Sequence, residues 1–122
     1  MLFSSYTMDE HATPVLLYEI QDKAELLNCY MPFLKNGGIF IPTDQGYDLG
    51  ETVRVMLIIM TEPEKFSIAG PVVWITPSNV HGNKMSGVGV AFPETVEGKR
   101  LKGCIESILG ASVLIPHTTY TL

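Results

Sequence analysis

Positive charge is scarce in this sequence. Eight lysines and arginines stand against thirteen acidic residues, which gives a formal net charge of −5. The only arginines are Arg54 and Arg100, and basic residues form no cluster. Because binding to a nucleic-acid backbone needs a basic surface that displaces phosphate counterions, we expect no nucleic-acid partner.

Long apolar runs are also missing. The longest, Val55–Met60, falls far short of the roughly 20 residues that a helix needs to cross a bilayer. The first residues lack the basic start of a secretory signal and carry Asp9 and Glu10 where its apolar core would continue. We therefore expect a cytoplasmic protein without direct membrane insertion. Its two cysteines, Cys29 and Cys104, are expected to be reduced and buried, although in a secreted protein they could form one bridge.

The residue sets that catalysis or metal binding requires are absent. The three histidines have no metal-ligand spacing to each other or to a cysteine, and no CxxC pair occurs. The nucleophile-elbow, P-loop and GxGxxG motifs are missing too. A cysteine–histidine nucleophile is formally possible, but both cysteines lie on predicted apolar helix faces, where burial raises a thiol pKa. We expect no enzyme activity, no metal and no cofactor. The histidines are His11, His81 and His117.

What the sequence does have is the composition of one β-rich domain. Its 122 residues, 46% of them hydrophobic, suffice for a single core, and its eleven glycines and eight prolines favour short elements joined by tight turns. Residues 1–13 are expected to be a loose leader, and residues 14–122 the domain.

Hydrophobic patterns predict the elements of that domain. Asp22 is expected to cap a helix over Lys23–Tyr30, and a second, amphipathic helix is expected from Gly98 onward, with Leu101, Ile105, Ile108 and Leu109 on its apolar stripe. Glycine takes positive φ without steric cost, so Asn36-Gly37-Gly38 predicts a turn. A bulge or bend is expected at Gly70-Pro71. These elements suggest a small barrel closed by a helix. Strands are predicted at Val15–Ile20, Ile39–Ile41, Glu51–Met60, Phe66–Ile75 and Gly87–Phe92.

Three stretches of the sequence, and its end, carry a resemblance to a known family. They are Tyr30–Thr43, Ala69–Pro77, Gly87–Phe92 and the closing Thr119–Leu122. Their order and spacing resemble the PilZ domain family, in particular its type IV pilus assembly subgroup, from about Val15 to the last residue. The resemblance implies an all-β fold with helical additions, a six-stranded antiparallel barrel with a C-terminal α-helix.

The resemblance also identifies where a ligand would bind. Most members of the family bind cyclic di-GMP through an Arg-x-x-x-Arg segment before the barrel and an Asp/Asn-x-Ser-x-x-Gly turn. That turn falls on Phe33–Gly38, where Phe33 replaces the Asp or Asn, Lys35 replaces the Ser, and only Gly38 matches. No arginine precedes the barrel. The resemblance therefore implies a degenerate site that does not bind the nucleotide.

Members of the pilus subgroup act through protein contacts. Their partners are the hexameric pilus-extension ATPase and, in some bacteria, a regulator with degenerate diguanylate cyclase and phosphodiesterase domains. The resemblance thus implies a non-enzymatic regulator of type IV pilus biogenesis and twitching motility. Aromatic residues bury a large area at little entropic cost, so those near loops and in the tail are candidate contacts. The candidates are Tyr30, Phe33, Pro116 and Tyr120.

Several alternatives remain open on the sequence alone. Tyr30 and Phe33 could instead close one end of the barrel, and Trp74 is expected in the core rather than at a contact. The tail, residues 115–122, could add a strand to a partner's sheet edge. The chain could also be a cyclic di-GMP receptor with an atypical site, or a small barrel module with another binding role.

Overall fold

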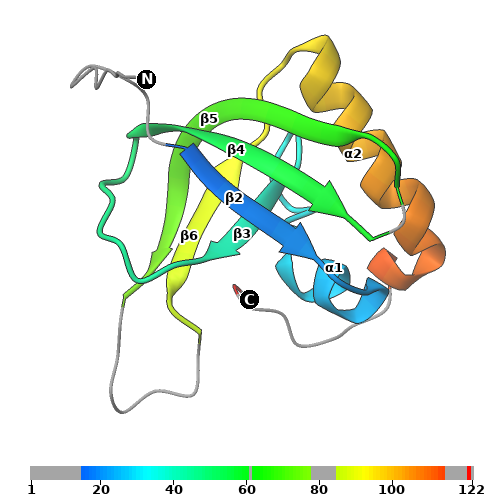
Figure 1. The fold of residues 1–122 in the computed structure, drawn as a ribbon, viewed down its shortest axis with the longest axis horizontal. Helices are drawn as coiled ribbons and strands as arrows, with labels where there is room; N and C mark the ends of the chain where they lie inside the picture. Colours follow the sequence, from blue (N-terminus) through cyan, green and yellow to red (C-terminus); the bar gives the residue numbers. More distant parts are fainter. Residues whose placement is uncertain (1–14, 61, 78–84, 115–120, 122) are drawn as a thin grey trace, which may run out of the picture.

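The computed structural model describes residues 15–60, 62–77, 85–114 and 121 as one curled sheet with helices on one face (Figure 1). The five strands of the sheet lie in the order β2-β4-β5-β6-β3. The strands are β2 (Val15–Ile20), β3 (Gly38–Pro42), β4 (Thr52–Ile59), β5 (Lys65–Thr76) and β6 (Gly87–Ala91). The helices are α1 (Lys23–Cys29), α2 (Val96–Leu109) and the 3₁₀ helix η1 (Gly110–Leu114).

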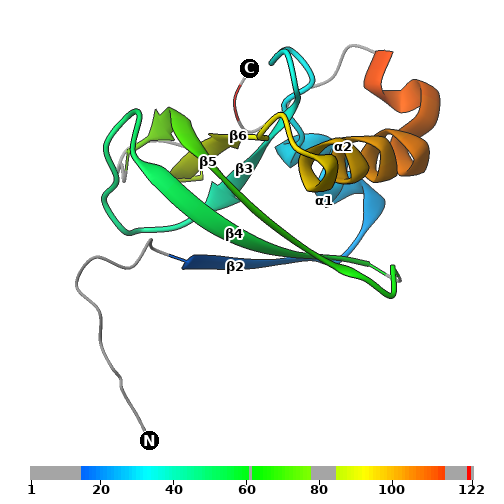
Figure 2. The ribbon, with the colours of Figure 1, turned by 90° about the horizontal axis from the view of Figure 1, so that it is seen from above.

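The sheet corrects part of the expected barrel. Five strands lie within the described residues, where the sheet curls into a half-barrel (Figure 2), so the sixth expected strand and the closed barrel are not shown there. The expected antiparallel arrangement is wrong for one pair, because β2 runs parallel to β4 from Val15 opposite Arg54 to Ile20 opposite Ile59. The reason lies in the connection. Residues 21–51 pass through α1 and β3 before β4 begins, and a crossover of that length returns the chain in its original direction.

The long strand β5 gives the sheet its curl. Its first part, Lys65–Pro71, pairs with β4, and its second part, Val72–Thr76, pairs with β6. The strand therefore changes partner next to Gly70-Pro71, where the sequence predicted a bend. The register shift itself lies a little further on, between Val72 and Trp74.

The helix ends follow local hydrogen-bonding rules. Asp22 caps α1, since its Oδ1 accepts a hydrogen bond of 2.8 Å from the amide of Glu25, as predicted. The helix ends one residue earlier than expected, because Tyr30 is extended. Helix α2 begins before Gly98, at Val96, because Thr95 caps it through a 3.1 Å bond from the Gly98 amide.

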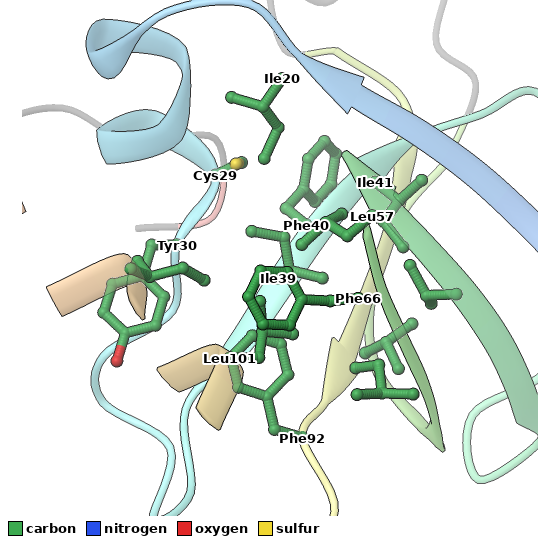
Figure 3. Packing of buried hydrophobic residues seen from close by; sticks show 14 of the residues in the cluster. Ile20, Cys29, Tyr30, Ile39, Phe40, Ile41, Leu57, Phe66, Phe92 and Leu101 are labelled. Carbon is green, nitrogen blue, oxygen red and sulfur yellow. The ribbon is translucent and has the colours of Figure 1, made fainter. Parts of the chain in front are cut away.

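The core lies between the concave face of the sheet and the two α-helices (Figure 3). Burial alternates along β4, so Val53, Val55, Leu57 and Ile59 face inward. Helix α2 contributes Leu101, Ile105 and Leu109, as its apolar stripe predicted, and α1 contributes Leu26 and Cys29. No helix in the described part of the chain is long and apolar enough to cross a membrane.

Candidate functional site

The glycine turn that follows α1 is held firmly against the sheet. Gly37 has a φ of 80°, and its amide donates to the Leu34 carbonyl at 3.0 Å. The Gly37 carbonyl accepts from the Phe92 amide at 3.0 Å, and the Gly38 carbonyl accepts from the Met31 amide at 2.9 Å. The turn over residues 33–38 is therefore a rigid feature at the end of β6, as the Asn36-Gly37-Gly38 pattern predicted.

Gly38 has a packing role that needs no ligand. A Cβ atom at this position would lie 2.6 Å from Leu34 Cδ1 and 2.9 Å from the Val90 carbonyl oxygen. The second of these is backbone and cannot rotate away. The one residue of the turn that matches the nucleotide-binding motif is thus explained by the close approach of β3 and β6.

The two motif positions that depart from the family pattern are on the surface. Phe33 is 49% exposed, and its ring offers no hydrogen-bonding atom. Lys35 Nζ lies 3.8 Å from Glu94 Oε2, with both side chains largely exposed, so this ion pair adds little to stability. Where the family motif places a carboxylate or amide and a hydroxyl, this turn presents an apolar ring and an ammonium group.

Neither arginine supplies the missing guanidinium at the turn. Arg100 on α2 donates to Glu64 Oε1 at 2.7 Å and to Glu97 Oε1 at 2.8 Å, and its guanidinium carbon lies 5.2 Å from the centre of the Phe66 ring. It is therefore engaged on three sides. Arg54 lies on β4, and its side chain is exposed on the face opposite the core.

Tyr30, a predicted contact residue, is buried at the junction of the turn and α2. Only 2% of it is exposed, and its ring stacks on Phe92 with 6.5 Å between the ring centres. Figure 3 shows its hydroxyl at the outer end of the ring, where it donates to Glu106 Oε2 at 2.6 Å. Lys102 Nζ donates to the same oxygen at 3.1 Å. The structure thus supports the packing alternative for Tyr30.

This small polar group perturbs two pKa values. Burial, followed by the neighbouring Glu106 carboxylate, raises the pKa of Tyr30 well above its usual range. The hydrogen bond from Tyr30 holds the pKa of Glu106 below its ordinary value, with help from Lys102. The arrangement favours a neutral phenol and an ionised carboxylate, so it fastens α2 to the turn without any proton transfer.

Tyr30→Phe tests this assignment. The substitution keeps the ring and removes the hydroxyl, so we expect the free energy of unfolding to fall by about 1 kcal/mol at neutral pH, because Glu106 is partly exposed to solvent. Since the folded pKa of Glu106 is lowered, the stabilisation is complete above the unfolded pKa of about 4.3 and is lost as pH falls through the folded pKa. Urea denaturation from pH 7 to 3 should show the two proteins converging in acid. A constant difference would contradict the role given to Glu106.

Of the other residues that the sequence singled out, the two cysteines and Trp74 are at least partly buried, and the rest lie outside the described part of the chain. Burial raises the pKa of both free thiols, with Cys29 fully buried and Cys104 partly so, which agrees with the expectation that they are not activated. Trp74 is half-buried and packs against the core, and its Nε1 donates to Thr76 Oγ1 at 2.9 Å. Within the described residues, no group of His, Cys, Asp and Glu could hold a metal ion. Pro116, Tyr120, His11, His81 and His117 lie outside the described residues.

Sequence reasoning missed two features. The first is Thr121, which is buried with only 2% exposed, although the tail has no hydrophobic period that would signal packing.

The second is a hollow of about 250 Å³, which lies between the loop after β3 and the adjoining ends of β5 and β6. Among the described residues, Asp44 lines it and no lysine or arginine does. Among its lining residues are Thr43, Asp44, Tyr47, Thr76 and Val88.

The comparisons with known proteins agree with the architecture. The profile of the PilZ domain matches residues 13–108, which include all five strands and most of α2. None of the curated proteins matches the chain. PilZ domains are binding and adaptor domains associated with cyclic di-GMP signalling, and the turn over residues 33–38 lies inside the matched region. On this match, which covers most of its length, the chain belongs to the PilZ domain family.

Proposed function

We propose that this PilZ-family chain is a non-enzymatic adaptor that regulates type IV pilus biogenesis and twitching motility through protein contacts, without binding cyclic di-GMP itself. The observation that carries the proposal is the side-chain chemistry of the turn over residues 33–38. Phe33 and Lys35 occupy the two polar positions of the binding motif, and both are exposed where a ligand would approach.

A nucleotide with two phosphates and two guanines needs complementary groups. Guanidinium groups bind phosphate through two parallel hydrogen bonds and can also read a guanine edge. Arg100 is already paired with Glu64 and Glu97, and no arginine precedes β2 in the sequence. An aromatic ring at position 33 could stack on a base but could not read it. These facts favour a protein partner over the nucleotide.

The pilus-extension ATPase is the proposed partner, with a degenerate cyclase/phosphodiesterase regulator as the proposed third member of the complex. This step depends on the resemblance to the pilus assembly subgroup. Phe33 is the exposed aromatic side chain of the turn, and a half-exposed ring held by the backbone bonds of the turn is a suitable interface anchor. Pro116 and Tyr120 remain proposed contacts.

Phe33→Ala tests the contact at the turn. We expect it to weaken binding to the purified pilus-extension ATPase of the same bacterium about tenfold, the usual effect of removing an aromatic anchor. Leu49→Ala is a matched control, because Leu49 is 66% exposed in a loop away from the turn. It should leave the affinity within about twofold. Biolayer interferometry with the immobilised chain would measure both. Equal affinities for the two variants would remove Phe33 from the interface, and no binding by the unaltered chain would overturn the pilus role.

A further inference from the structure

The outer face of β2 and β4 carries the two most exposed large apolar side chains of the described strands. It comprises Val15, Leu17, Arg54, Met56 and Ile58, which we call the β2–β4 outer face. Register places Val15 opposite Arg54 and Leu17 opposite Met56. Alternation along each strand directs these side chains away from the core, which is formed by the intervening residues of the same strands.

Among the described residues, nothing covers this face. Both α-helices lie on the opposite side of the sheet, against its concave surface (Figure 2). Leu17 is 68% exposed and Val15 is 61% exposed, the highest values among the large apolar side chains of the strands. Single exposed apolar residues are common on protein surfaces, but here two of them lie on the same face of β2, with Met56 of β4 opposite Leu17.

The sequence of β4 shows the pattern of a strand that is covered on both faces. Val55–Met60 is apolar without interruption, whereas a strand with one wet face alternates apolar and polar residues. The free edge of β2 within the described chain also lacks the lysine or proline that commonly protects an edge strand.

Arg54 gives the face its charge character. It has no ion-pair or hydrogen-bond partner among the described residues, in contrast to Arg100, and its neighbours in register are Val15 and Ala69. A single cation on an apolar surface, in a chain of net charge −5, is complementary to a carboxylate surrounded by apolar side chains. At one end of the face, Ile58 of β4 lies between Glu19 of β2 and Lys65 of β5. These two charged residues form a polar rim.

We infer that the β2–β4 outer face is a second docking surface, and that its occupant is a partner protein whose contact surface is apolar around a carboxylate. The inference rests on the proposed function, because the partner that it names for the test is the pilus-extension ATPase. The surface is separate from the turn at residues 33–38, so the two contacts can be broken independently.

Leu17→Asp and Arg54→Glu test the inference against the purified ATPase. Each should weaken binding at least tenfold, the first by placing a charge in an apolar contact and the second by reversing the charge of the cation beside Val15. Leu49→Asp is the matched control, because Leu49 has nearly the same exposed fraction as Leu17, 66% against 68%, and lies in the loop before β4. It should bind within twofold of the unaltered chain. Melting temperatures and sedimentation velocity of the full-length variants complete the experiment.

The outcomes separate this inference from the proposed function. If the unaltered chain binds the ATPase and Leu17→Asp binds equally well, the docking surface is wrong and the pilus role stands. If the unaltered chain does not bind, both are overturned. A fall in melting temperature specific to Leu17→Asp would mean that another part of the same chain covers Leu17, which overturns the inference. A dimer that Leu17→Asp converts to a monomer would identify the occupant as a second copy and overturn it as well.

Discussion

Gly70→Ala is expected to be one of the most damaging single-methyl additions to this domain. A Cβ atom at Gly70 would collide with the carbonyl oxygen of Ala91, and it would also lie 3.5 Å from Val90 Cγ1. The first obstacle is backbone, so the clash can be relieved only by separating β5 from β6 where β5 changes partner. We expect the free energy of unfolding to fall by about 3 kcal/mol, the upper end of the usual cost of overpacking.

Gly103→Ala is the matched control, and its effect should have the opposite sign. Gly103 lies in the middle of α2, is exposed, and has no atom within 4 Å of the position its Cβ would take. Because glycine is a poor helix former, this substitution should raise the free energy of unfolding by about 0.5–1 kcal/mol. Urea denaturation of both variants would measure the difference. Equal free energies of unfolding for the two variants would contradict the close approach of Gly70 to the Ala91 carbonyl oxygen.

The second large expected result is that cyclic di-GMP does not bind. Each charge-assisted hydrogen bond contributes about 1.5–3 kcal/mol, and two bidentate guanidinium groups make about four of them, or roughly 6 kcal/mol at the lower limit. A micromolar complex has a binding free energy of about −8 kcal/mol. Because both arginines are missing, and Phe33 and Lys35 replace the polar side chains of the motif, we expect the remaining binding free energy to be too small for a complex even at millimolar concentration.

Much of the fold could be predicted because local signals agree with the final packing. The cap at Asp22 and the stripe of α2 each depend on neighbours within a few residues, and each was confirmed. The parallel pairing of β2 with β4 could not be predicted in this way. Strand direction depends on the path of residues 21–51 through space, and no local pattern along those residues encodes it.

The candidate site was harder to predict because chemistry and burial are separate properties. An aromatic residue near a proline can lie either at a protein contact or in the core, and the sequence does not distinguish the two. In the structure Tyr30 is buried against Phe92, whereas Phe33 is half-exposed. The partner of the Tyr30 hydroxyl, Glu106, is distant in sequence and could not have been identified from spacing. The β2–β4 outer face was missed for a similar reason, since an apolar run such as Val55–Met60 does not reveal which of its faces remains uncovered.

The central claim is that the nucleotide entrance of this PilZ domain has lost its binding chemistry, and isothermal titration of the full-length chain with cyclic di-GMP tests it most directly. We expect no saturable heat with the nucleotide up to about 1 mM, which corresponds to a binding free energy weaker than about −4 kcal/mol. A saturable transition in the micromolar range, abolished by Phe33→Ala or Lys35→Ala, would contradict the claim.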